Sequence, residues 1–172
     1  MIIGHGPSGY IATHYLSKHF AASGVGRVVL LVLGIVGALA PDLDMFYFHL
    51  VDGRQHHHHT YFSHWPVFWF AVLLVALAWQ WLQPRSRYAA LCVIFCIGGV
   101  LHILLDSIVG DIWWLAPWVD RPYALFTVPA LYQPWWLNFL LHWSFALELA
   151  LWIWALLIYR RRASAGVEGL SR

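Results

Sequence analysis

Four long runs of apolar residues dominate the chain, separated by segments that contain glycine, proline or charged residues. They cover residues 28–40, 66–82, 88–109 and 135–159. A helix of about 20 apolar residues crosses the hydrocarbon core of a bilayer. The runs therefore predict membrane-spanning helices, the first of which is expected to end at Pro41.

A more polar stretch, residues 9–20, precedes the first run, and its apolar positions recur at helical spacing. It is too polar to face lipid on every side. It either crosses the membrane against the other helices or lies flat at the interface, giving five spans or four, and we favour five. The expected fold is an all-α, polytopic membrane helix bundle in one domain, residues 1–162, with a flexible polar tail over residues 163–172.

The composition supports a membrane protein and excludes several soluble classes. Of the 172 residues, 61% are hydrophobic and 10% are charged, whereas soluble domains carry about 25% charged residues. The abundance of apolar side chains excludes disorder, and a net charge of +2 provides no basic surface for nucleic acid. The expected environment is the lipid bilayer, where the twelve tryptophans suit the interfaces.

Basic residues between the runs predict the orientation. Lys18 and Arg27 precede the first run, Arg85 and Arg87 lie between the second and third, and residues 160–162 follow the last. Such residues mark the cytoplasmic side of what is expected to be a bacterial inner membrane. The segments on the opposite side are acidic and rich in histidine, so this face is expected to be extracytoplasmic.

Eleven histidines are unusual in so apolar a chain. His102 and Asp106 lie one helical turn apart on one face of the third run. Ionisable groups inside a spanning helix are costly and usually functional, although a structural hydrogen bond between these two is the alternative. Both lie near the outer end of their run, where the topology also places other histidines and aspartates.

Imidazole and carboxylate groups are ligands of zinc, manganese and related divalent ions. We expect one or two divalent ions, zinc first, with manganese or another ion as the alternative, at the extracytoplasmic end of the bundle. The candidate ligands are His5, His14, Asp42, Asp44, His59, His64, His102 and Asp106.

Some of these candidates have a second interpretation. His14 competes with His5 for the N-terminal ligand position, or it pairs with Glu148 in a structural contact within the bundle. The histidines of residues 56–59 could be an adventitious metal-binding loop, from which only His59 is selected.

Three further positions remain open at this stage. Asp42 and Asp44 could instead form the solvated end of a helix. His142 is equally consistent with a ligand and with a structural side chain.

Taken in order, the candidate residues resemble the motifs of a family named for an inferred metal-dependent hydrolase activity in membranes. Its members are also described as LexA-binding, inner-membrane-associated hydrolases. His5 with Gly9 is similar to the family's N-terminal histidine element. Pro41, Asp42 and Asp44 are similar to its Pro-Asp-x-Asp element.

The remaining motifs follow in the same order. His59, Ser63 and His64 keep the spacing of the family's His-Arg-x-x-Thr-His-Ser element, although Thr60 and Trp65 stand where the family has Arg and Ser. The His-x-x-x-Asp pair matches His102 and Asp106, and the Trp-rich loop of residues 114–118 resembles the last element.

The resemblance implies a metal-dependent hydrolase, and we expect one that cleaves a phosphoester of a lipid or lipid-linked substrate at the outer face. A fainter likeness to the zinc-dependent phospholipase C group, in motif spacing alone, favours this chemistry. Asp44, His64 and Asp106 are the expected catalytic residues, and Arg121 is expected to clamp the phosphate. Tryptophans between residues 113 and 136 are expected beside the lipid headgroups.

The alternatives are a metal-ion transporter or sensor, and a non-catalytic membrane protein with a structural metal. A transporter gives its site access to both sides of the membrane. Only His14 and Glu148 lie at intermediate depth, and the inner halves of the other runs are almost wholly apolar. This pattern favours a fixed site that opens to one side.

The orientation predicts a labelling pattern. Cysteines introduced at Asp52 or Asp120 are expected to react with a membrane-impermeant reagent on intact cells, because both positions lie in the outer segments. A cysteine at Arg85 is expected to stay unlabelled. The opposite pattern would reverse the orientation and move the candidate site to the cytoplasmic side.

Overall fold

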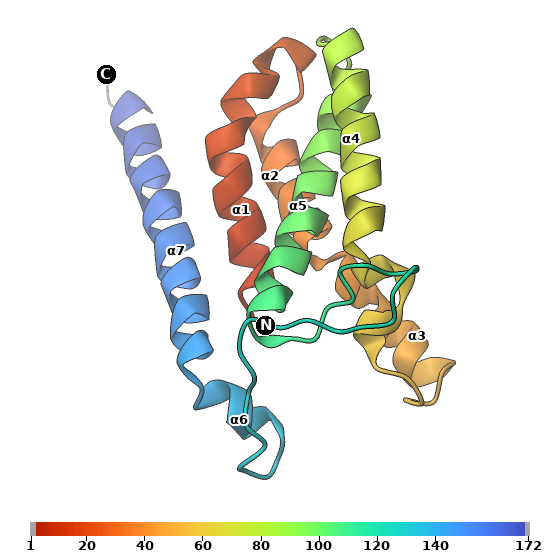
Figure 1. The fold of residues 1–172 in the computed structure, drawn as a ribbon. Coiled ribbons are helices and arrows are strands. Elements are labelled where there is room, and N and C mark those ends of the chain that lie inside the picture. The colour runs from red at the N-terminus through yellow and green to blue at the C-terminus, as the bar shows by residue number, and fades with distance from the viewer. Residues whose placement is uncertain (1–2, 171–172) are drawn as a thin grey trace.

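The computed structural model of the chain describes residues 3–170, and the side chains of residues 3–162. Within this part the protein is all-α, and its one β contact is a bridge between Ile112 and Tyr123. Four helices stand side by side and a fifth long helix lies next to the first of them (Figure 1). These are α1 (His5–Leu16), α2 (Arg27–Leu39), α4 (Pro66–Leu82), α5 (Arg87–Val109) and α7 (Trp143–Leu170).

Short helical elements connect the long helices. The turn after α1 is a 3-10 helix, and α2 leads through another into α3. Two more 3-10 helices precede α4, and α6 precedes α7. In chain order they are Ser17–Ser23, Pro41–Leu43, α3 (Asp44–Leu50), His58–Thr60, Phe62–His64 and α6 (Trp136–Leu140).

Three of the four apolar runs form helices, α2, α4 and α5, that begin and end close to the predicted residues. Pro41 ends α2, and Pro66 occupies the first turn of α4, where its missing N–H has no partner to lose. The Ser86 hydroxyl accepts the Ala89 N–H over 3.3 Å and caps α5. The fourth run instead breaks between α6 and α7, and α7 continues as far as Leu170, through most of the predicted tail.

Fewer helices meet the requirements for crossing a membrane than the four to five predicted. Among the described residues, α5 and the part of α7 up to Arg162 are long and apolar enough, and α2 with the bent segment Pro41–Leu50 forms a third candidate. The bend between these two parts is 55°. α4 is apolar but has only 17 residues, and α1, with 12 residues, spans about 18 Å. The prediction of a membrane protein is supported, whereas the number of spans is not confirmed.

The apolar core lies between α2, α4 and α5. Leu30 of α2 is buried against Val93 and Ile94 of α5, with Ala76 of α4 and Phe20 of the turn after α1 closing the sides. Burying side chains of this size removes apolar surface from contact with solvent and fixes the three helices together. The core therefore sits on the side of the bundle away from α7.

Glycines let α1, α2 and α5 approach one another backbone to backbone. A Cβ added to Gly98 would lie 2.6 Å from the backbone nitrogen of Ala38, and one added to Gly9 would lie 2.4 Å from the carbonyl oxygen of Gly34. Small residues at helix contacts permit such approach and are typical of membrane bundles. The ends of α1, α2 and α5 are therefore close enough for their side chains to meet.

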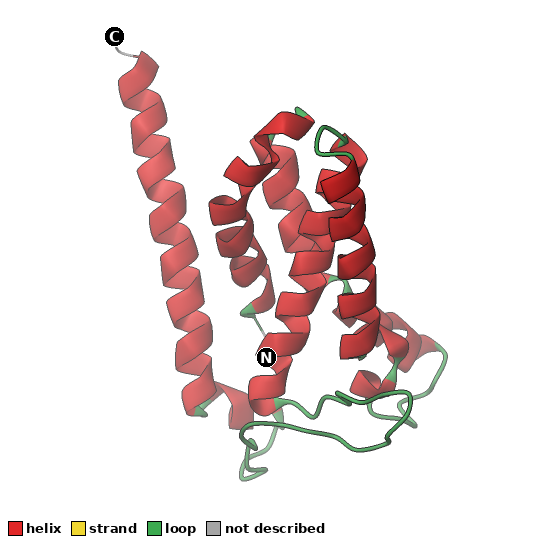
Figure 2. Ribbon diagram, turned by 45° about the horizontal axis from the view of Figure 1, so that its top comes forward, coloured by secondary structure: helices red, strands yellow, loops and turns green. Residues whose placement is uncertain are grey.

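The last helix is attached mainly through α1. Ile11 packs against Ala155 and Ile158, and the Trp152 indole donates to the Ile3 carbonyl over 2.9 Å. Both views show that α7 stands apart from α4 (Figures 1 and 2). The bundle of α1, α2, α4 and α5 thus forms the framework, and α7 is fastened to its edge.

The glycine contact predicts a large stability difference between two similar substitutions. Gly98→Ala is expected to force α2 and α5 apart and to cost about 1–3 kcal/mol, the usual penalty for overpacking a tight interface. Gly26→Ala is the matched control, because a Cβ there meets no atom within 4 Å. Thermal unfolding in detergent, followed by circular dichroism, measures both. Equal melting temperatures would mean that the backbone contact does not determine stability.

Candidate metal centre

Five candidate residues from four parts of the chain meet at one end of the bundle. His5 opens α1, Asp42 follows the end of α2, His64 precedes α4, and His102 and Asp106 lie in the last two turns of α5. The start of α1 and the end of α5 lie together there (Figure 1). The long loop between α5 and α6 lies across the same end (Figure 2).

The ligand atoms of four of these residues form one compact group. One atom each from Asp42, His64, His102 and Asp106 lie within 4.8 Å of one another. His102 Nε2 lies 3.0 Å from Asp106 Oδ2, 3.2 Å from His64 Nε2 and 3.6 Å from Asp42 Oδ1. Two ligands bound at 2.0–2.1 Å to one tetrahedral ion lie about 3.3–3.4 Å apart. The spacing therefore fits a shared divalent ion.

The outer hydrogen bonds of His102 and His64 fix which ring nitrogen faces the group. His102 Nδ1 lies 2.8 Å from the carbonyl oxygen of Ala38, and His64 Nδ1 lies 2.6 Å from Asp44 Oδ2. A carbonyl or carboxylate oxygen can only accept, so each Nδ1 carries the hydrogen and donates it. In the neutral ring, Nε2 then keeps its lone pair, which is the arrangement that orients histidines in metal sites.

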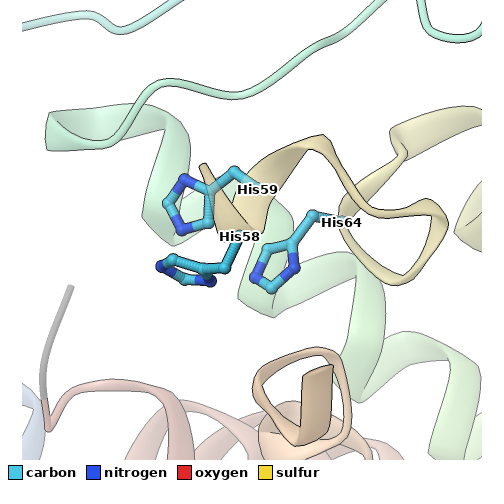
Figure 3. Close-up of side chains that lie close together, drawn as sticks. All are labelled: His58, His59 and His64. Atoms are coloured by element: carbon cyan, nitrogen blue, oxygen red, sulfur yellow. The ribbon is translucent and has the colours of Figure 1, made fainter. Parts of the chain in front are cut away.

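His59 joins the group with the same geometry. Its Nδ1 donates to the Asp111 carbonyl over 2.9 Å, and its Nε2 lies 3.6 Å from Asp106 Oδ2. The rings of His58, His59 and His64 face a common space (Figure 3), and one ligand atom of each lies within 4.8 Å of those of the other two.

His5 contributes from the opposite side. Its ring is 2% exposed, with Nδ1 2.6 Å from His102 Nδ1 and Nε2 3.1 Å from Asp106 Oδ1. The Nε2 contact lacks hydrogen-bond alignment, which leaves this buried nitrogen without a hydrogen-bond partner. Buried polar atoms are rarely left so, and an ion shared with Asp106 would give His5 Nε2 a partner.

The environment shifts the pKa values of the two loop histidines, His59 and His64, in opposite directions. Burial lowers the pKa of His59 to about 2, so its ring is neutral and can act as a ligand. Burial also disfavours the charged form of His64, but the carboxylates of Asp42 and Asp44, 3.7 Å and 2.6 Å from its two ring nitrogens, outweigh it and raise the pKa to about 9. At neutral pH the His64 ring is therefore protonated, and it becomes a ligand only when the proton on Nε2 leaves as the ion binds.

Asp44 lies behind His64, away from the compact group. Its Oδ2 accepts from both His64 Nδ1 and the Ser63 hydroxyl, each over 2.6 Å. Asp44 thus holds the His64 ring through Nδ1, so that Nε2 of this ring faces the group. The candidate role of Asp44 is therefore to position His64.

Two other residues singled out from the sequence, His14 and His142, lie elsewhere. His14 lies about 13 Å along α1 from His5, where its Nδ1 contacts Arg27. It is separated from the group, so the choice between the two histidines falls on His5. His142 contacts Ser144 at the start of α7 over 2.9 Å.

Glu148 and Arg121 also differ from expectation. Glu148 accepts the backbone N–H groups of Ile3 and Gly4, the latter over 2.8 Å, so it holds the start of α1 and does not pair with His14. Arg121 is exposed and lines a separate hollow beside Trp114. The loop folds back through the Ile112–Tyr123 bridge, which carries Arg121 away from the group.

A cavity of about 580 Å³ opens onto the group. Its lining combines polar groups, among them Asp42, Asp106 and residues 57–59, with apolar side chains from α3, the end of α5, the long loop and α6. The apolar lining consists of Met45, Val109, Phe126, Val128, Trp135 and Phe139. The cavity thus offers polar groups and apolar surface to the same occupant.

Sequence reasoning missed the two backbone acceptors and His58. Ala38 and Asp111 act through their carbonyl oxygens, which no side-chain pattern reports. His58 stands in a histidine run from which the sequence pattern selects only His59, yet its Nδ1 lies 3.6 Å from Asp44 Oδ1. Only the spacing of His58 within the run of residues 56–59 could have indicated that it lies near the group.

A family model described as YdjM inner membrane protein matches residues 1–167. No curated protein and no solved structure matches the chain.

The geometry predicts that His102 is a metal ligand. His102→Ala is expected to reduce the metal bound to the purified protein at least about 10-fold, since it removes one ligand and the anchor to Ala38. His142→Ala, which lies outside the group, is the control. Metal is measured by elemental analysis of protein that still inserts and elutes as a single species. Unchanged metal in folded His102→Ala would refute the assignment.

Proposed function

The chain belongs to the YdjM inner membrane protein family, and we propose that it is a membrane-embedded, metal-dependent hydrolase. One observation carries the proposal. Three histidines are each held at Nδ1 by an oxygen acceptor, and each turns its Nε2 toward Asp106. A structural His–Asp hydrogen bond needs one such histidine, whereas a divalent ion needs several.

The proposed ligands are those whose atoms converge. Asp42, His64, His102 and Asp106 form the group, and His5 and His59 complete it from two sides. Zinc suits this mixture of nitrogen and oxygen ligands, and manganese or another divalent ion is the alternative. When bound, such an ion lowers the pKa of a coordinated water toward neutrality and polarises a phosphoryl oxygen.

The protein's own groups have distinct tasks in this proposal. Asp44 and Ser63 hold His64 in place, and the Ala38 carbonyl holds His102. Asp106 sits between His5 on one carboxylate oxygen and His102 on the other, which makes it the residue least replaceable. Arg121 is left out of the phosphate site because it lines a different hollow.

The cavity supports a lipid or lipid-linked phosphoester as substrate. Its apolar lining, which includes Phe126, Trp135 and Phe139, suits an acyl or isoprenoid chain close to the polar ligands. Trp118 and Trp135 are 75% and 64% exposed, as expected for side chains at headgroup level. We place the site at the extracytoplasmic face on the distribution of basic residues.

Hydrolysis of phosphoesters tests the proposal. Protein in lipid nanodiscs is expected to hydrolyse at least one of a chromogenic phosphomonoester, a chromogenic phosphodiester and a phosphatidic-acid-type lipid. A chelator should abolish this activity and Asp106→Asn should reduce it about 100-fold or more. His142→Ala is the matched control and should keep the activity.

The rival function is separated by a flux measurement. A carrier with the same ligands would move zinc or manganese into proteoliposomes, and Asp106→Asn would stop it. We expect no flux, because the core beyond the group is formed by apolar side chains such as Leu30, Val93 and Ile94. Metal uptake without hydrolysis would overturn the hydrolase, and stoichiometric metal with neither activity would indicate a structural site.

A further inference from the structure

Two buried polar atoms face each other on the far side of His64 without hydrogen-bond partners. They are Asp44 Oδ1 and His58 Nδ1, 3.6 Å apart. The Asp44 side chain is 8% exposed and that of His58 is 23% exposed. A separation of 3.6 Å is too long for a hydrogen bond, but it is close to the spacing of two ligands on one ion.

The charge around Asp44 makes the pair unusual. Its Oδ2 already receives hydrogens from His64 and Ser63. If His64 uses Nε2 as a ligand, as the proposed function requires, its ring is neutral and cannot balance the carboxylate. A buried carboxylate without a compensating cation is costly, so positive charge is needed beside Oδ1.

We propose that Asp44 Oδ1 and His58 Nδ1 hold a second divalent cation beside the first. This inference rests on the proposed function, because it takes His64 to be a ligand of the first ion. The ligand atoms of His58, His59 and His64 lie within 4.8 Å of one another, so the two positions are neighbours (Figure 3). His58 lines the cavity and Asp44 lines a separate pocket of about 850 Å³, so the proposed cation would lie between the two.

The position gives the second cation a task that the first group leaves open. Among the described residues, those that line the cavity include no lysine or arginine. A phosphoester approaching His58 would therefore meet a divalent cation in place of a basic side chain. A divalent cation at this position would attract the anionic phosphoryl group and help to orient it.

Metal stoichiometry of single variants provides the first test. Zinc bound per protein in nanodiscs is expected to be two for the wild type and one for His58→Ala. His56→Ala is the matched control from the same histidine run: its side chain is 66% exposed and bonds Asp52, and the variant should keep two. Circular dichroism verifies that each variant is folded.

A cobalt spectrum provides the second test and does not depend on activity. His58→Cys loaded with cobalt is expected to show a thiolate-to-cobalt charge-transfer band, which the wild type, with Cys92 and Cys96 only, and His56→Cys should lack. One ion in both wild type and His58→Ala, with no band in His58→Cys, would overturn this inference and leave the first site intact. No bound metal in the wild type would overturn the proposed function as well.

Discussion

The contact between α2 and α5 determines the geometry of the whole metal centre. Gly98 allows the two backbones to approach until His102 reaches the carbonyl of Ala38. That carbonyl belongs to the last turn of α2, where Pro41 prevents the helix from continuing and leaves acceptors without intrahelical donors. This one hydrogen bond therefore gives the Ala38 carbonyl a donor and sets the direction of the His102 ring. Without the close approach of the two backbones, His102 would not reach this carbonyl.

Much of the site could be predicted because it follows from helix periodicity and topology. The four-residue spacing of His102 and Asp106 puts both on one face, and the ends of α2 and the start of α4 lie at the same side of the bundle. His5 was placed there by the same reasoning. What could not be predicted depends on backbone groups and loops, which carry no residue pattern. The carbonyl that anchors His59 and the fold-back that removes Arg121 are both of this kind.

The predicted four to five spans are not confirmed because two of the helices are short. α1 has 12 residues and α4 has 17, fewer than the about 20 that cross a bilayer. Pro41 ends α2 after 13 residues, so α2 qualifies only together with Pro41–Leu50, which is bent from it by 55°. The fourth run is divided at Leu141 and His142, and its part from Trp143 still qualifies as a span.

The attachment of α7 makes the position of His5 depend on a helix far away in the sequence. Glu148 and Trp152 form hydrogen bonds with the backbone of Ile3 and Gly4, immediately before His5. Ribosomal synthesis delivers α1 first and α7 last, with the histidine loop and α5 in between. His5 therefore gains its final support only when the last helix has been inserted. In biosynthesis, the polar cluster is therefore completed only after α7 has been made.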